Sequence, residues 1–136
     1  MKAVVIDASM TIEWFFPDRS SARSEAALEK RAILDTRVAV VPHIWRFEIM
    51  NYFAGKLRRR EISESDATWI LAEMMRVPFA IADEGPSPAL VTLAQVHGLT
   101  AYDAAYLRVA LLAGEPLATL DRQLIHAAEA VGVEIA

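Results

Sequence analysis

The sequence contains no cysteine among its 136 residues. Disulfide bridges and zinc sites built from thiolates are therefore excluded, and a secreted domain that depends on disulfides is not expected. No apolar run approaches the roughly 20 residues that a membrane-spanning helix needs. The start, MKAVVIDASM, has one lysine and a short apolar run that Asp7 interrupts, which is unlike a secretory signal peptide. These absences lead us to expect a cytoplasmic protein with no membrane association.

The chain also lacks an excess of basic residues, since 14 Lys and Arg face 18 Asp and Glu and the net charge is −4. Proteins that coat nucleic acid without regard to sequence have the opposite balance. One local basic run is present, at Lys56, Arg58, Arg59 and Arg60. A solvated helix end and a contact to RNA phosphates explain this run equally well, and both stay open.

The composition that remains indicates one globular domain, residues 1–136. Hydrophobic residues make up 54% and charged residues 24%, which is enough apolar material for a core. The chain has no repeat and no low-complexity tract. Proline and glycine cluster only in DEGPSP, residues 83–88, and a cluster of this size marks a loop.

Short apolar runs alternate with helical patterns along the chain. The predicted strands are Ala3–Ile6, Val38–Val41, Phe79–Ala82, Leu117–Thr119 and Val133–Ile135. The predicted helices cover residues 9–15, 20–34, 43–60, 87–97, 100–113 and 121–130, with one more beginning at Ser63. This alternation predicts an α/β domain with a parallel sheet and helices on both faces. Such sheets bind ligands beyond the carboxyl ends of their strands.

Three aspartates lie where predicted helices begin. Asp7 follows the first strand, Asp121 follows the fourth, and Asp103 lies three residues after Thr100. Each has a structural explanation: Asp7 and Asp121 suit helix N-caps, and Thr100 with Asp103 suits a capping box. Taken together, however, these positions share one edge of a parallel sheet, so the three carboxylates are expected near one another.

A fourth carboxylate, Glu48, lies in the apolar segment PHIWRFEIMNYF with Asn51 one turn later. A helix apolar on nearly every side is expected to be largely buried, so both polar groups need partners. An internal hydrogen bond or an ion pair is one explanation, although Arg46 points to another side of the helix. The other is a cation site. Four clustered carboxylates raise one another's pKa values, and a hard divalent cation such as Mg²⁺ or Mn²⁺ removes the conflict.

Four motifs in this sequence resemble those of a known family. They are VIDAS, PHIWRFEIMN, LTAYDAAYL and LATLD, starting at residues 5, 42, 99 and 117. In this order they are similar to the acidic motifs of PIN-domain ribonucleases, and above all of VapC-type toxins from toxin–antitoxin pairs. The resemblance assigns metal binding and catalysis to Asp7, Glu48, Asp103 and Asp121. It assigns supporting polar roles to Ser9, Asn51 and Thr119. Some members carry a further acidic residue that this chain lacks between residues 122 and 127.

The resemblance implies a single PIN domain with about five parallel strands. It also implies a Mg²⁺- or Mn²⁺-dependent endoribonuclease that cleaves structured RNA, either tRNA or rRNA. Its partners would be a small VapB-type antitoxin and a second copy of the chain in a homodimer. The run Arg58, Arg59 and Arg60 is the candidate RNA contact, and Trp14, Phe15 and Trp45 are a candidate groove for an amphipathic segment of the antitoxin.

Two alternatives from other classes remain. The first is a phosphoryl-transfer enzyme of the haloacid-dehalogenase type, because DASMT resembles its D-x-D-x-T signature. Ser9 replaces the second aspartate of that signature, which would remove the general acid. The second is a PIN-like module that binds a partner without catalysis. The four filled acidic positions argue against the second alternative.

Overall fold

The computed structural model describes residues 2–16, 20–82 and 84–136, and a parallel sheet runs through its centre. The strands are β1 (Ala3–Ile6), β2 (Val38–Val41), β3 (Phe79–Ile81) and β4 (Leu117–Ala118), in the order β3-β2-β1-β4. The helices are α1 (Ala8–Phe15), α2 (Ala22–Lys30), α3 (Ile44–Arg58), α4 (Glu64–Met75), α5 (Pro88–His97), α6 (Ala101–Ala113) and α7 (Arg122–Ala130), and a 3₁₀ turn, η1 (Arg31–Asp35), follows α2.

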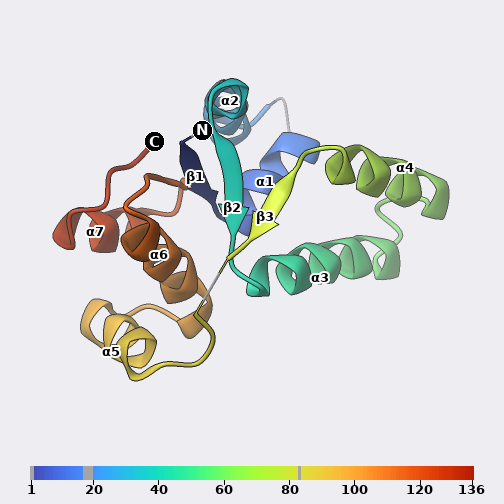
Figure 1. Cartoon of the computed structure of the whole chain (residues 1–136). Coiled ribbons are helices and arrows are strands. Elements are labelled where there is room, and N and C mark those ends of the chain that lie inside the picture. The colour runs from blue at the N-terminus through green and yellow to red at the C-terminus, as the bar shows by residue number, and fades with distance from the viewer. Residues whose placement is uncertain (1, 17–19, 83) are drawn as a thin grey trace.

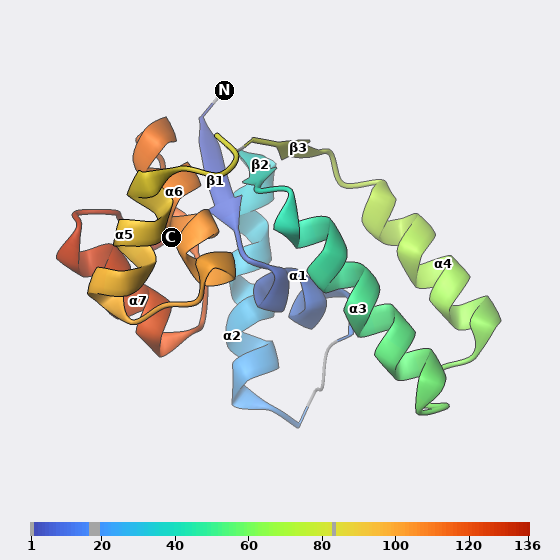
Figure 2. The same cartoon turned by 90° about the horizontal axis from the view of Figure 1, so that it is seen from below.

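The helices lie on both sides of this sheet, as the alternating pattern predicted. α5, α6 and α7 lie on one side, and α1, α3 and α4 lie on the other (Figures 1 and 2). α6 packs against β1 and β4, and α1 packs against α2 and α3. β1 is enclosed between these layers, since Val4, Val5 and Ile6 are completely buried. No helix in the described ranges is long and apolar enough to cross a membrane.

The sheet is one strand smaller than expected. The predicted strand Val133–Ile135 appears only as a single parallel bridge between Ile135 and Leu117, beyond the outer edge of β4. The partner strand β4 has just two residues, so there is little edge for a further strand to pair with. The fold class agrees with the prediction, and the difference concerns the count of strands.

The helix ends follow the predicted capping chemistry. Side chains of Asp7, Ser63, Thr100 and Asp121 each accept a backbone N–H from the first turn of the helix that follows. Gly98 ends α5 with φ of 63°, in the left-handed region that glycine adopts without steric cost. The bonds of Asp7 and Asp121 hold the starts of α1 and α7 at the ends of β1 and β4, whereas α4 and α6 each follow another helix.

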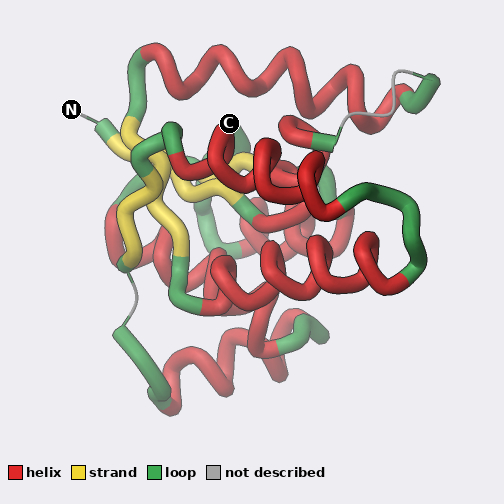
Figure 3. Tube along the Cα trace, turned by 90° about the vertical axis from the view of Figure 1, so that its right-hand side faces the viewer, coloured by secondary structure: helices red, strands yellow, loops and turns green. Residues whose placement is uncertain are grey.

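α3 is more exposed than predicted. It pairs with α4 as a hairpin at the side of the sheet (Figure 3). Trp45, Ile49 and Phe53 are buried, whereas Phe47 is 65% exposed and Met50 is 43% exposed. The prediction of a largely buried helix was wrong because α1 and α4 cover only part of its circumference.

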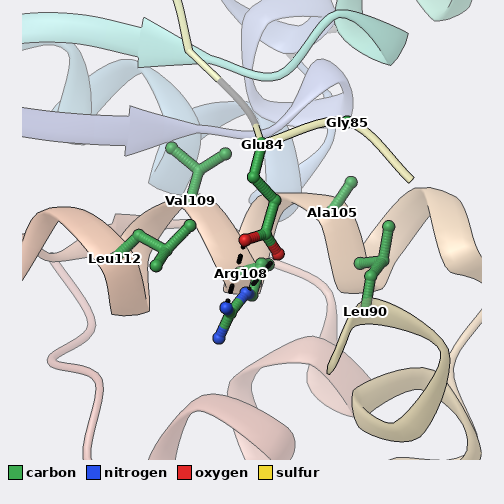
Figure 4. Close-up of a pocket in the computed structure, with 7 residues that line it drawn as sticks. All are labelled: Glu84, Gly85, Leu90, Ala105, Arg108, Val109 and Leu112. Carbon is green, nitrogen blue, oxygen red and sulfur yellow. Dashed lines mark hydrogen bonds and ion pairs between the residues drawn. The ribbon is translucent and has the colours of Figure 1, made fainter. Parts of the chain in front are cut away.

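A small cavity of about 80 Å³ lies between α6 and the loop after β3 (Figure 4). Its most polar feature is the ion pair of Glu84 with Arg108 on α6. Arg108 donates from Nε and from Nη2 to the two Glu84 oxygens, at 2.6 and 3.2 Å. The pair fastens the loop to α6. None of the four candidate carboxylates lines this cavity, so it is separate from the site described next.

Candidate active site

Asp7 lies at the carboxyl end of β1, and neighbouring polar groups hold its carboxylate in place. The residue is 5% exposed. The Met10 amide donates to Oδ1 at 2.8 Å, and the hydroxyls of Ser9 and Thr119 donate to Oδ2. Thr119 can reach Asp7 because β4 pairs directly with β1, in register Ile6 with Ala118. The pairing of β1 with β4 therefore brings together two side chains that are 112 positions apart in the sequence.

Thr119 also joins Asp7 to Asp121. Its hydroxyl oxygen accepts the Asp121 amide at 3.1 Å while the same hydroxyl donates to Asp7. The Asp121 carboxylate caps α7 by accepting the Leu124 amide at 2.8 Å. Thr119 is completely buried, so this connection lies inside the protein.

Asp103 lies in the first turn of α6, and its amide donates to the Thr100 hydroxyl at 3.1 Å. The predicted capping arrangement is therefore present. The carboxylate is also close enough to Asp121 for their repulsion to raise the pKa of Asp103, in addition to the larger effect of burial. Capping and proximity to a second carboxylate occur together at this residue.

Glu48 lies half-buried on α3, and its partner is Tyr106 of α6. The phenol of Tyr106 donates to Glu48 Oε1 at 2.7 Å, and the Ala8 amide hydrogen-bonds the phenol oxygen in turn. Tyr106 is 1% exposed. This one hydroxyl therefore ties together α3, α6 and the first turn of α1. Within residues 2–16, 20–82 and 84–136, the partner of Glu48 is therefore this phenol, and neither Arg46 nor another basic side chain forms an ion pair with it.

The electrostatics link the four carboxylates in a series. Burial raises the pKa of Asp7 above its ordinary value, while the bonds from Thr119, Met10 and Ser9 act in the opposite direction. Burial raises the pKa of Glu48 as well, and repulsion from Asp103 and Asp7 adds to the rise. With the effect of Asp121 on Asp103, repulsion links every one of these carboxylates to at least one other. Such a cluster favours either protons or a cation.

The donor chemistry of this cluster fits a hard divalent cation. Carboxylate and hydroxyl oxygens are the ligands that Mg²⁺ and Mn²⁺ prefer, and the sequence offers no thiolate. Across residues 2–16, 20–82 and 84–136, no three such side chains converge closely enough to form a ready-made metal cage. The carboxylates are thus near enough to repel one another, but no three of them point at a common position where a cation could bind all of them. Their assignment as metal ligands stays a prediction.

A groove of about 350 Å³ runs between α1 and α3 and includes Glu48. α1 contributes Ala8, Ser9 and Ile12 to its lining. α3 contributes Glu48, Asn51, Tyr52 and Gly55, with Arg59 from the turn that follows the helix. Two of the predicted supporting residues, Ser9 and Asn51, are thus at the surface beside Glu48, whereas Thr119 is buried. Arg59 is the member of the basic run that reaches this groove.

The predicted aromatic groove is not open. Trp14 is 2% exposed and donates to the Ala27 carbonyl, and Trp45 is 5% exposed and donates to the Thr11 hydroxyl. Thr11 in turn donates to the Asp7 carbonyl at 3.1 Å, so Trp45 helps to fix α3 against the start of α1. The apolar groove that does exist lies between α3 and α4, with Trp45, Ile49, Leu71 and Met74 among its lining residues.

Two residues at the site, Tyr106 and Gly55, were not predicted from the sequence. Tyr106 follows Asp103 by three positions and therefore lies on the same side of α6, which was an available signal. Gly55 lies seven positions after Glu48 on the same side of α3. Its position inside a helix, where glycine is unfavourable, was a second signal.

Comparison with known proteins identifies the family of this chain. The family model of the PIN domain matches residues 4–130. The chain belongs to the PIN domain family. Among curated PIN relatives it is 32% identical to Ribonuclease VapC3 of Pyrobaculum aerophilum over 124 residues. This alignment spans 89% of this chain and 91% of that protein. It is 28% identical over 130 residues to Ribonuclease VapC1 of Mycobacterium tuberculosis, which covers 93% and 92%. This PIN domain is therefore of the VapC type.

Two solved structures share the PIN fold seen here. PAE2754 from Pyrobaculum aerophilum superposes with a TM-score of 0.71 at 23% identity, over 93% of this chain and 79% of that one. FitAcB from Neisseria gonorrhoeae superposes with a TM-score of 0.65 at 19% identity, over 97% and 95%. At these identities the two structures support the fold alone.

Proposed function

We propose that this PIN domain is a toxin of the VapC type that hydrolyses phosphodiester bonds in structured RNA, tRNA or rRNA, with Mg²⁺ or Mn²⁺ as cofactor. The observation that carries the proposal is the series of carboxylates linked by repulsion, Asp7 and Asp103 with Glu48 and Asp121 with Asp103, in a chain related to VapC ribonucleases. The likeness to VapC proteins is also the ground for proposing a cytoplasmic location. Membership of the PIN family replaces the haloacid-dehalogenase alternative.

Asp7, Glu48, Asp103 and Asp121 would hold the cation, directly or through water. A divalent cation held there would supply an activated water and would neutralise charge on the leaving oxygen. The protein residues do the rest. Ser9 and Thr119 keep the Asp7 carboxylate oriented, and Tyr106 holds Glu48 Oε1. We propose that Glu48 helps to position the attacking water, because Tyr106 fixes one of its two carboxylate oxygens.

The direct test is cleavage of total tRNA and rRNA by the purified protein with Mn²⁺, followed by sequencing of the new RNA ends. We expect cleavage at few positions, and Asp103→Asn should abolish it. Asp66→Asn on α4 is the matched control, because Asp66 lies in the first turn of another helix and is exposed. Equal activity of wild type and Asp103→Asn would contradict the proposed site. A folded wild type that cleaves no RNA would favour the partner-binding module instead.

Control of such an enzyme is proposed to come from a small VapB-type antitoxin, with the toxin as a homodimer. The clustered carboxylates attract an arginine or lysine as well as a metal. The double variant Asp7→Asn with Asp103→Asn should therefore bind the antitoxin more weakly, most clearly at low salt. Equal affinity of the two forms would mean that the antitoxin blocks access without placing a charge among the carboxylates. Sedimentation of the free toxin reports whether it is a dimer.

A further inference from the structure

One side of α3 connects the candidate active site to the basic run. Glu48, Asn51, Tyr52, Gly55 and Arg59 recur at helical spacing and line the same groove. Gly55 is seven residues beyond Glu48, which is about 10 Å along the helix axis. A substrate strand that reaches Glu48 can therefore continue along this groove to the level of Gly55.

Arg59 turns back over α3 because Gly55 has no side chain. A Cβ built on Gly55 lies 3.0 Å from Arg59 Nη1, and the three nearest atoms all belong to the Arg59 guanidinium. A side chain at this position would force the guanidinium to shift, by a few tenths of an ångström for a Cβ alone. The glycine therefore keeps a cationic group inside the groove, on the side that leads to Glu48.

Glu61 binds this cation and a second one with separate oxygens. Arg59 Nε lies 2.9 Å from Oε1, and Lys56 Nζ lies 3.1 Å from Oε2. Lys56 also lies over the ring of Tyr52, which lines the groove. A phosphate group offers the same pair of anionic oxygens to arginine and lysine. The side chains of Arg59 and Glu61 are 57% and 42% exposed, so an incoming strand can reach them.

We propose that Arg59 and Lys56 bind a backbone phosphate of the RNA a few nucleotides from the cleaved bond, at a position that Glu61 occupies in the free protein. The offset follows from the roughly 10 Å between the levels of Glu48 and Gly55 along the helix axis. The inference rests on the proposed ribonuclease function and adds a substrate contact to it. Arg58 and Arg60 neither line the groove nor pair with Glu61, so they have no part in this contact.

The test measures binding of total tRNA in EDTA, where cleavage is stopped, as a function of salt. Arg59→Gln should weaken binding about two- to fivefold, the effect of one exposed ion pair, and reduce the log–log salt slope by about 0.7. Glu61→Gln should strengthen binding. Arg76→Gln is the control of equal charge change, because Arg76 ends α4 and its side chain is 77% exposed.

Gly55→Ala tests whether the position of the Arg59 guanidinium matters, as distinct from its charge. It changes no charge, yet it shifts the guanidinium, so it should weaken tRNA binding by less than Arg59→Gln does, and it should have no effect when Arg59 is already Gln. Its melting temperature should not fall, since alanine favours the helix. Single-stranded RNAs of 4, 8 and 12 nucleotides add a length test. The effect of Arg59→Gln should disappear with the shortest RNA.

Several results would overturn the inference. They are equal losses for Arg59→Gln and Arg76→Gln, wild-type binding by Gly55→Ala, or unchanged binding by Glu61→Gln. If these variants weaken the antitoxin complex and leave tRNA binding unchanged, the position belongs to a protein partner. A wild type that cleaves RNA while the variants bind normally refutes only the phosphate position. A wild type that neither binds nor cleaves RNA refutes the proposed function together with it.

Discussion

Tyr106 offers the sharpest test of how the site is held together. Tyr106→Phe removes one oxygen that donates to Glu48 and receives the Ala8 amide. A hydrogen bond to an ionised group contributes about 1.5–3 kcal/mol, and the Ala8 N–H loses its partner at a helix start. We expect the free energy of unfolding at pH 7 to fall by about 2 kcal/mol. For a domain of this length the melting temperature should drop by roughly 6–10 °C.

The loss should depend on pH in a defined direction. Burial raises the pKa of Glu48 and the Tyr106 bond lowers it, so removal of the bond raises this pKa further. A carboxyl whose folded pKa exceeds its unfolded value costs stability as pH rises from the unfolded pKa through the folded one. The variant should therefore lose more stability than the wild type between pH 4 and pH 7. At pH 4 Glu48 is protonated, and the remaining cost should be about 1 kcal/mol.

Thermal melts in EDTA at the two pH values provide the measurement, because no metal then competes for Glu48. Tyr102→Phe is the control: it makes the same chemical change on the same helix, at a residue that is 59% exposed. The reasoning fails if Tyr106→Phe loses as much at pH 4 as at pH 7. It also fails if the loss is no larger than that of Tyr102→Phe.

Three further predictions concern the carboxylates and the basic run. Asp7→Asn should abolish cleavage yet melt at or above the wild-type temperature at pH 7, and this advantage should vanish below about pH 4, where Asp7 is protonated. Mn²⁺ at one hundred times its Kd should add about 2.7 kcal/mol to the free energy of unfolding of the wild type and so raise its melting temperature, and Asp103→Asn should reduce this rise. No rise at millimolar Mn²⁺ would argue against the cluster as a metal site. Arg58→Gln with Arg60→Gln should change the salt slope of tRNA binding less than Arg59→Gln alone.

The sequence by itself determined the local structure and the edge at which the candidate residues gather. Capping bonds span three residues, so Asp7, Thr100 and Asp121 could be recognised as helix starts from the chain alone. Apolar runs and helical spacing identified the four strands and the helices between them, and also a fifth strand that the structure reduces to a single bridge. A parallel sheet places the carboxyl ends of its strands at one edge, so Asp7 and Thr119 could be expected at the same edge, but that β4 is the direct neighbour of β1 was seen only in the structure.

Only the tertiary structure decided which groups touch. The bond from Tyr106 to Glu48 joins residues 58 positions apart, and it depends on how α3 and α6 approach the start of α1. Packing also decided that Trp14 and Trp45 are in the core while Phe47 faces solvent. In the same way, the space above Gly55 brings Arg59 into the groove. Composition and periodicity carry no information on such contacts, because they arise when separate elements meet and compete for the same surface.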